Sequence, residues 1–147
     1  MQQLLQILVA GGDRRQQYAA QKLAESPQLS VTTIGFSQSD SETLPEFDVL
    51  VLPIHTTAES VPSKNGNLSL PELLSHVKKG GLVCGGVLPE AVCRMCQEQE
   101  LCFCDYFQRE ELCLANAVPT VEGAIQIAIS ERETVLCGSS VLVIGYG

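Results

Sequence analysis

The chain ends in Gly145-Tyr146-Gly147, a glycine-x-glycine turn that directly follows the apolar run at 141–144. In a dinucleotide-binding domain, such a turn after a strand lets the backbone approach a pyrophosphate at the start of a helix. Gly145 and Gly147 are therefore the candidate residues for binding NAD or NADP. The helix and third glycine of the G-x-G-x-x-G pattern do not follow in this sequence, so an ordinary glycine turn is the alternative.

A second glycine turn, Gly11-Gly12, precedes Asp13, Arg14 and Arg15. It has neither the third glycine of a dinucleotide fingerprint nor the Ser/Thr-rich loop with which flavodoxins hold a phosphate. Asp13 can cap the helix that follows, and either arginine can bind a carboxylate through two parallel hydrogen bonds. These three residues are candidate substrate ligands, and a capped turn with solvated arginines is the alternative.

Further candidates come from the carboxyl ends of the other predicted strands, where open α/β sheets bind their ligands. These ends carry His55-Thr56-Thr57, Gly85-Gly86 and Asp105-Tyr106. His55 is the candidate catalytic residue, because its ordinary pKa suits proton transfer near neutral pH. A surface or hydrogen-bonding histidine is the alternative, and Thr56 is a candidate substrate ligand.

Arg109 and Glu122 flank the start of a helix predicted to begin at Pro119-Thr120. Thr120 suits an N-cap, and Glu122 in the first turn suits the helix dipole, so capping is the plain account. The functional account places both residues in a cleft between two domains, with Arg109 facing an acidic substrate.

The cysteines do not indicate a metal site. Their number, seven, is odd and no secretion signal accompanies them, which favours reduced thiols. Cys93-x-x-Cys96 and Cys102-x-Cys104 resemble paired zinc ligands, but the first pair falls in a predicted helix and the second in a predicted strand. Small buried hydrophobic side chains are the preferred interpretation, and no metal is expected.

Charge and hydropathy exclude some classes of partner. With 17 acidic and 9 basic residues the net charge is −8, which repels nucleic acid and anionic membranes. No apolar run approaches the ~20 residues of a membrane span, and the first residues lack a signal-peptide pattern. A cytoplasmic location is therefore expected.

Apolar runs alternate with helical patterns along the chain. Strands are predicted at 4–10, 31–34, 48–53, 82–84 and 101–104, and helices at 13–24, 69–77 and 89–99. A break in regular secondary structure is predicted at Gly80-Gly81. The segments 37–43 and 55–67 read as loops. This order predicts an α/β fold with a doubly wound, mostly parallel five-stranded sheet in three layers, flavodoxin-like or Rossmann-like.

The last third of the chain predicts a different organisation. A helix from Pro119 carries an apolar stripe with Ile127 on a second face, so we expect burial on two sides and a possible homodimer through this helix. Residues 1–118 are the expected substrate-side domain, 119–138 a connector helix, and 139–147 the first strand and glycine turn of an NAD(P)-binding domain.

Together these segments resemble the A subunit of dipicolinate synthase over essentially the whole chain. The resemblance is carried by Gly11-Gly12-Asp13-x-Arg15-Gln16, Leu52-Pro53-Ile54-x-Thr56, Gly85-Gly86, Asp105-Tyr106-x-x-Arg109-Glu110-Glu111 and Asn116-Ala117-x-Pro119-Thr120-x-Glu122-Gly123-Ala124-Ile125-Gln126. The last of these is the most specific. One departure is His55, which stands where the family is expected to have proline.

The resemblance implies an NAD(P)-dependent enzyme that oxidises dihydrodipicolinate to dipicolinate in the cytoplasm of the sporulating mother cell. It implies a two-domain protein whose partner is a flavoprotein-like B subunit, so this stretch of chain alone is expected to be inactive. The matching domain of a 2-hydroxyacid or alanine dehydrogenase is one alternative. A non-enzymatic flavodoxin-like regulatory or binding module is another, although Pro53 ends the third strand where a receiver would need an aspartate.

Overall fold

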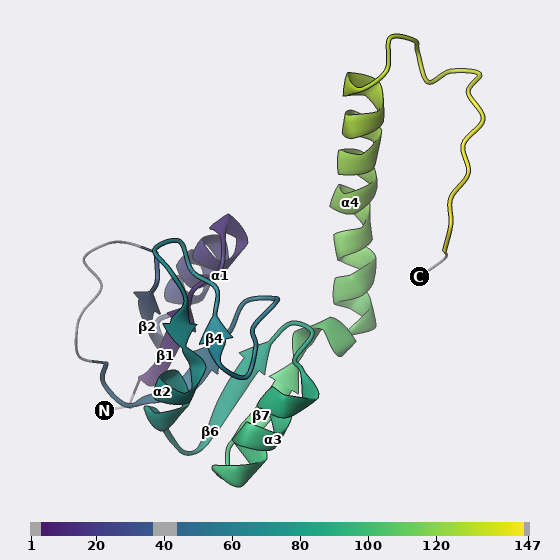
Figure 1. Ribbon diagram of the computed structural model, residues 1–147. Helices are drawn as coiled ribbons and strands as arrows, with labels where there is room; N and C mark the ends of the chain where they lie inside the picture. Colours follow the sequence, from purple (N-terminus) through teal and green to yellow (C-terminus); the bar gives the residue numbers. More distant parts are fainter. Residues whose placement is uncertain (1–3, 37–43, 146–147) are drawn as a thin grey trace. The chain divides into compact units, whose positions relative to one another are not determined.

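The computed structural model describes residues 4–36 and 44–145 and divides the chain into two units, Met1–Arg109 and Glu110–Gly147 (Figure 1). The first unit is built on a parallel sheet whose strands are β1 (Leu5–Ala10), β2 (Leu29–Ile34), β3 (Phe47–Val51), β6 (Val77–Gly85) and β7 (Cys102–Asp105). Their order is β2-β1-β3-β6-β7, with every pairing parallel. This flavodoxin-like order confirms the predicted α/β fold.

Helices cover both faces of the sheet (Figure 1). Helix α1 (Arg14–Ala24) packs Ala20 against Ile7 and Val9 on one face. Helices α2 (Leu70–Ser75) and α3 (Glu90–Glu98) pack on the other face, against Leu8 and Leu50. Leu8 lies on this face because successive strand residues point to opposite sides of the sheet. The predicted cap of α1 is confirmed, because the Asp13 carboxylate accepts from the Arg15 N–H. Helix α2 is capped by Ser69, the first residue of the predicted helix, whose hydroxyl accepts from the Glu72 N–H.

Two local predictions in this unit are wrong. The predicted loop at 55–67 contains β4 (Ser60–Val61), which pairs antiparallel with β5 (Leu68–Ser69). Two residues are too short to show an alternating pattern, yet Val61 is fully buried in the core. The break expected at Gly80-Gly81 lies within β6, which continues from Val77 with a shift in its register against β3.

In the second unit, α4 spans Glu110–Ser130 with Pro119 inside it, so the predicted helix start at Pro119 is wrong. The residues before Pro119 are mostly good helix formers, and they outweigh the one backbone hydrogen bond that proline removes. Thr120 is consequently no N-cap; its hydroxyl donates to the Asn116 carbonyl at 2.8 Å. Glu122 therefore lies in the helix interior, outside the first turn.

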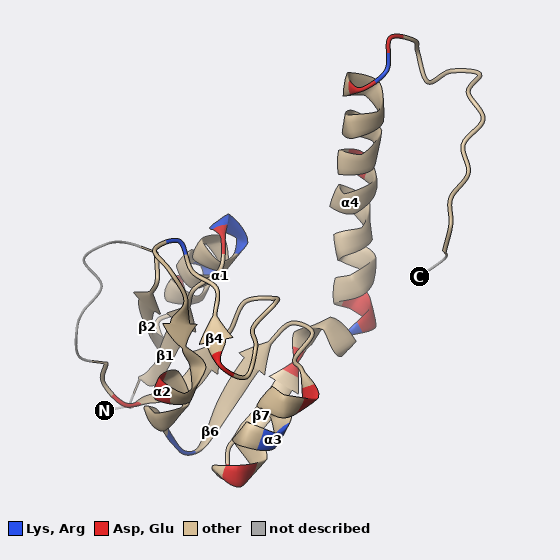
Figure 2. Ribbon diagram, in the orientation of Figure 1, with Lys and Arg blue, Asp and Glu red and all other residues tan. Residues whose placement is uncertain are grey.

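None of the described side chains of α4 is buried, which contradicts the expected burial on two sides. Its charged residues are Glu110 and Glu111 in the first turn and Glu122 in the interior, so most of its surface is uncharged (Figure 2). By length and composition α4 can cross a membrane, since it has 21 residues and an 18-residue window within it has a mean hydropathy of 1.4. This contradicts the expectation that no apolar run approaches a span. That is weak evidence, since a core helix passes the same test.

The strand predicted at 141–144 is not formed in the described chain. Its residues are exposed, from 77% for Val143 to 90% for Ile144. A strand needs a neighbour to accept and donate its backbone hydrogen bonds, and the described part of this unit offers none. The roles assigned to 119–138 as a connector and to 139–147 as part of a second domain stay predictions.

Asp48 links three neighbouring strands at the end of the sheet opposite the predicted site. Its carboxylate accepts from the Gln6 N–H at 2.8 Å and from the Lys78 ammonium at 2.7 Å. The hydrogen bond from Lys78 is the main cause that holds the pKa of Asp48 below its ordinary value. The ionised form is therefore favoured in the folded state.

We predict that Asp48→Ala lowers the free energy of unfolding by about 1–3 kcal/mol at neutral pH, because it removes a charged acceptor. The lowered pKa of Asp48 means that its contribution is present above the unfolded-state pKa of about 3.9 and disappears as the pH falls below it. The free energies of unfolding of the parent and Asp48→Ala, measured with urea, should converge as the pH is lowered from neutral to acidic. Lys22→Gln, at an exposed ion pair with Glu25, is the control; an equal loss there, or a deficit independent of pH, would contradict the assignment.

Candidate functional site

The turn after β1 is a tight contact between three segments. Gly11 and Gly12 have φ angles of +56° and +86°. The Gly11 N–H donates to the Ile34 carbonyl at 2.8 Å, and the Gly12 N–H to the Pro62 carbonyl at 2.6 Å. A Cβ on Gly11 would collide with the Pro62 carbonyl oxygen, and one on Gly12 would lie 2.8 Å from the Pro53 Cβ. Both positions therefore require glycine.

Asp13 and Arg15 form an ion pair at the start of α1. The Arg15 Nη2 lies 2.7 Å and its Nε 3.0 Å from the Asp13 Oδ2. The hydrogen bond from Arg15 is the largest cause that lowers the pKa of Asp13, and the same pairing raises the pKa of Arg15. Both side chains remain more than half exposed, so solvent screens the pair and its main effect is to orient the guanidinium.

The segment after β3 passes beside this turn. Thr56 is buried, with 2% of its surface exposed, and its hydroxyl donates to the Pro53 carbonyl at 2.9 Å. His55 is exposed and has a φ of +69°, a left-handed conformation that histidine tolerates better than most residues. Thr56 thus closes the loop on which His55 lies.

Asp105, at the end of β7, holds the loop that follows β6. Its carboxylate accepts from the backbone N–H groups of Val87, Leu88 and Phe107 at 3.1, 3.0 and 2.9 Å. Val87 has a φ of +55°, which is unfavourable for a β-branched residue and costs roughly 1–3 kcal/mol. The three hydrogen bonds to one carboxylate offset that strain and fix the loop.

Tyr106, directly after β7, connects the end of that strand with the residue that follows β3. Its hydroxyl donates to the Leu52 carbonyl at 3.3 Å, and its ring lies where a Cβ on Gly86 would stand. Burial, and secondly the charge of Asp105, raise the pKa of the Tyr106 phenol, whereas the charge of Arg15 acts in the opposite direction. The phenol therefore stays neutral at physiological pH. We call Gly12, Asp13, Arg15, Thr56 and Tyr106 the carboxyl-edge site.

The structure brings only some of the predicted site residues together. Asp13, Arg15 and Thr56 belong to the carboxyl-edge site, and Arg14 is exposed beside it on α1. Arg109 is exposed, and its N–H donates to the Tyr106 carbonyl at 3.3 Å. Glu122 and Gly145 lie in the second unit, and Gly147 lies outside the described residues.

Two residues with clear roles were not predicted as site residues. Tyr106 was predicted only as part of the end of a strand, although a tyrosine directly after a strand can indicate a site residue. Gln16 is 8% exposed, and its side-chain amide donates to the Val51 carbonyl at 3.2 Å, which joins α1 to β3. A glutamine in an amphipathic helix carries no comparable signal. Within residues 4–36 and 44–145, no three His, Cys, Asp or Glu side chains gather as metal ligands.

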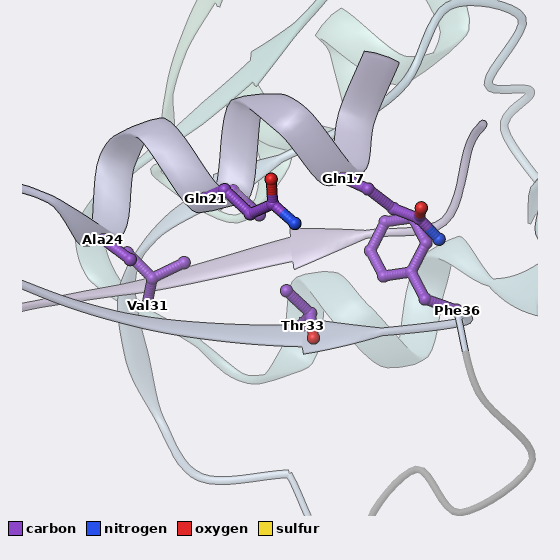
Figure 3. Close-up of a pocket in the computed structure, with 7 residues that line it drawn as sticks. Gln17, Gln21, Ala24, Val31, Thr33 and Phe36 are labelled. Carbon is purple, nitrogen blue, oxygen red and sulfur yellow. The ribbon is translucent and has the colours of Figure 1, made fainter. Parts of the chain in front are cut away.

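A groove of about 320 Å³ lies between α1 and the edge strand β2 (Figure 3). Its lining consists of Gln17, Ala20, Gln21, Ala24, Val31, Thr33 and Phe36. None of these side chains is charged, and none belongs to the carboxyl-edge site. The groove therefore offers no counter-charge for an acidic ligand.

Known proteins similar to this chain agree with one another. Residues 6–107 match the family model that describes the N-terminal domain of the dipicolinate synthase A subunit. The A subunit of dipicolinate synthase from Bacillus subtilis (strain 168) is 29% identical over 162 residues, which cover 97% of this chain and 54% of that protein. The chain thus spans about half the length of this relative.

Two crystal structures share the fold. The dipicolinate synthase A subunit from Bacillus halodurans has a TM-score of 0.78 at 22% identity, and the match covers 92% of this chain and 52% of that subunit. The A chain of dipicolinate synthase from Bacillus subtilis has a TM-score of 0.70 at 25% identity, and the match covers 91% of this chain and 50% of that one.

We predict that Gly12→Ala lowers the free energy of unfolding by about 2 kcal/mol or more, because the new Cβ adds a steric clash to the backbone strain. Gly80→Ala is the matched control, since Gly80 has a similar φ of +73° but no atom within 4 Å of an added Cβ. Chemical unfolding of both variants measures the difference. Equal losses would show that the contact with Pro53 is unimportant.

We predict that Tyr106→Phe costs about 0.5–1.5 kcal/mol near neutral pH through loss of the hydrogen bond to Leu52. Because the pKa of Tyr106 is raised in the folded state, its contribution is full below the unfolded pKa of about 10 and declines as the pH rises above it. The free energy of unfolding, measured across alkaline pH, should therefore fall less steeply with rising pH in Tyr106→Phe than in the parent. Tyr18→Phe, at a 65% exposed tyrosine, should match the parent, and a matching slope in Tyr106→Phe would refute the assignment.

Proposed function

The chain belongs to the family of dipicolinate synthase A-subunit N-terminal domains, and we propose that its carboxyl-edge site binds the dicarboxylate substrate of an NAD(P)-dependent oxidoreductase. The observation that supports this most is that the Gly12 turn and the Tyr106 hydroxyl both meet the chain at Leu52-Pro53, directly after β3 and beside the switch point between β1 and β3. Ligands of open α/β sheets bind at such a point. The reaction proposed for the whole enzyme is the oxidation of dihydrodipicolinate to dipicolinate during sporulation.

Arg15 is the residue best placed to bind a carboxylate. Its guanidinium has five N–H donors, and the pair with Asp13 occupies only Nε and one side of Nη2. Donors therefore remain for a substrate carboxylate, held in an orientation that Asp13 sets. Arg14 adds a second cation at the same helix start, which matters because the chain as a whole carries a charge of −8 and repels a dianion.

Tyr106 suits the recognition of an anion because its phenol is neutral. A phenol with a raised pKa donates a hydrogen bond to a carboxylate without opposing it by charge. The present hydrogen bond to Leu52 is long, at 3.3 Å, and a bond to a charged carboxylate is stronger, so the hydroxyl can exchange one for the other.

The catalytic proton acceptor we propose is His55, with Arg109 and Glu122 as further substrate ligands. The buried Thr56 contributes by holding the loop, because its hydroxyl donates to the Pro53 carbonyl. His55 is exposed on a loop that Thr56 holds in place, so its ring can reach solvent or substrate. When bound, the nicotinamide supplies the acceptor for the hydride that the oxidation removes. Glu122 belongs to the second unit, and its role is proposed for the whole protein.

The described residues do not themselves form a nicotinamide site. Gly145 has a φ of +96°, but no strand precedes it among the described residues, whereas a phosphate-binding turn follows a strand. We propose that the cofactor is held by the remainder of a two-domain protein, of which this chain is about half. This chain alone should be inactive.

The other assignments follow from the family. We propose that the partner is a flavoprotein-like B subunit, that the protein lies in the cytoplasm of the mother cell, and that a homodimer buries the apolar side chains of α4. An origin in a 2-hydroxyacid or alanine dehydrogenase is disfavoured by the family match over residues 6–107. A non-enzymatic module is disfavoured by the same match.

Calorimetric titration of the chain with dipicolinate tests the proposal. Arg15→Gln should weaken binding by about 10-fold or more, since a charge-assisted hydrogen bond contributes about 1.5–3 kcal/mol, and Arg14→Gln should weaken it less. Lys22→Gln, in the last turn of the same helix, should bind like the parent. Equal affinity of Arg15→Gln and Lys22→Gln, with α1 intact by circular dichroism, would remove Arg15 from the site.

A further inference from the structure

Cys84 and Cys104 lie directly opposite each other on neighbouring parallel strands, β6 and β7. Opposite residues of paired strands point to the same face of the sheet. Adjacent strands lie about 4.8 Å apart, which is within the Cα separation of about 4.4–6.8 Å that a disulfide spans. The backbone positions of the two cysteines therefore suit a disulfide.

The two cysteines end a row of paired residues, Val9, Val51, Cys84 and Cys104, on the face of the sheet that carries α1. Exposure increases along this row, from fully buried Val9 to half-buried Cys84 and exposed Cys104. Burial, and secondly the charge of Cys104, raise the pKa of the Cys84 thiol. The influence of Cys104 agrees with the proximity that the register gives.

We propose that Cys84 and Cys104 form a reversible disulfide, a redox modification site at the carboxyl ends of β6 and β7. The oxidant is a peroxide. The exposed Cys104 thiolate attacks one peroxide oxygen, the O–O bond breaks, and hydroxide departs. Cys104 then carries a sulfenic acid. The Cys84 sulfur then loses its proton and attacks the Cys104 sulfur, so that the S–S bond forms, the S–O bond breaks and water leaves.

The other cysteines of the first unit are less suited to this chemistry. Cys102 pairs with Leu82 in the register, one side-chain repeat away from Cys84. Cys93 and Cys96 lie on α3, where Cys96 is fully buried and burial raises its pKa to about 11. An inaccessible, protonated thiol reacts slowly with oxidants.

The bond would join two strands immediately before the loops of the carboxyl-edge site. Cys84 precedes Gly85 and Gly86, and Cys104 precedes Asp105 and Tyr106. The disulfide therefore restrains the positions from which Tyr106 and the Asp105-held loop project. Its formation does not depend on the identity of the ligand.

The test is peptide mapping of the whole chain after treatment with hydrogen peroxide and blocking of residual thiols. Trypsin with a glutamate-specific protease separates Cys84, in 80–90, from Cys93, and places Cys102 and Cys104 in 101–109. We expect these two peptides to be linked, with a mass lower by two hydrogens than their sum. Treatment with dithiothreitol should release them.

Single variants identify the sulfurs. The link should be lost in Cys84→Ser and Cys104→Ser, and kept in Cys102→Ser and Cys93→Ser, with circular dichroism confirming that all four fold. Phenylarsine oxide, which binds paired thiols, should protect the pair from oxidation in the parent as a measure that needs no variant. A link that survives in Cys104→Ser, a link through Cys102, or no link between these peptides would overturn the proposal.

Discussion

The close contact between the Gly11-Gly12 turn and the chain at 53–62 is the constraint on which the rest of the site depends. It places the end of β1 against Pro53 and Pro62 with no space for a side chain. Helix α1 must therefore begin at the sheet edge, with Asp13 as its cap. Because β1 and β3 are parallel neighbours, their carboxyl ends open at the same edge, and the loops that follow are brought together there.

The chemistry of this edge results from groups that restrain one another. Asp13 orients Arg15, Thr56 closes the loop of His55, and Asp105 holds a strained Val87. Each hydrogen bond contributes little to the free energy of folding because most of these groups are partly solvated. Together they leave an exposed guanidinium and a neutral phenol in fixed positions. Such preorganisation lowers the entropy that a ligand must lose on binding.

Much of this arrangement was predictable from local patterns. The apolar runs revealed five strands, and Asp13 and Ser69 revealed two helix starts, because strand burial and capping are local effects. The pairing of Arg15 with Asp13 depends on rotamers, and the hydrogen bond from Tyr106 to Leu52 depends on strand order, neither of which a local pattern encodes. Pro119 misled the helix assignment because proline favours helix starts but is tolerated inside a helix of strong formers.

Amide NMR of the chain titrated with dipicolinate tests the central claim, that a dicarboxylate binds at the sheet edge beside β1 and β3. The account predicts chemical-shift changes at Gly12, Arg15 and Tyr106, with the groove residues Gln21 and Thr33 unaffected. Changes confined to that groove, or none at saturating dipicolinate, would contradict it.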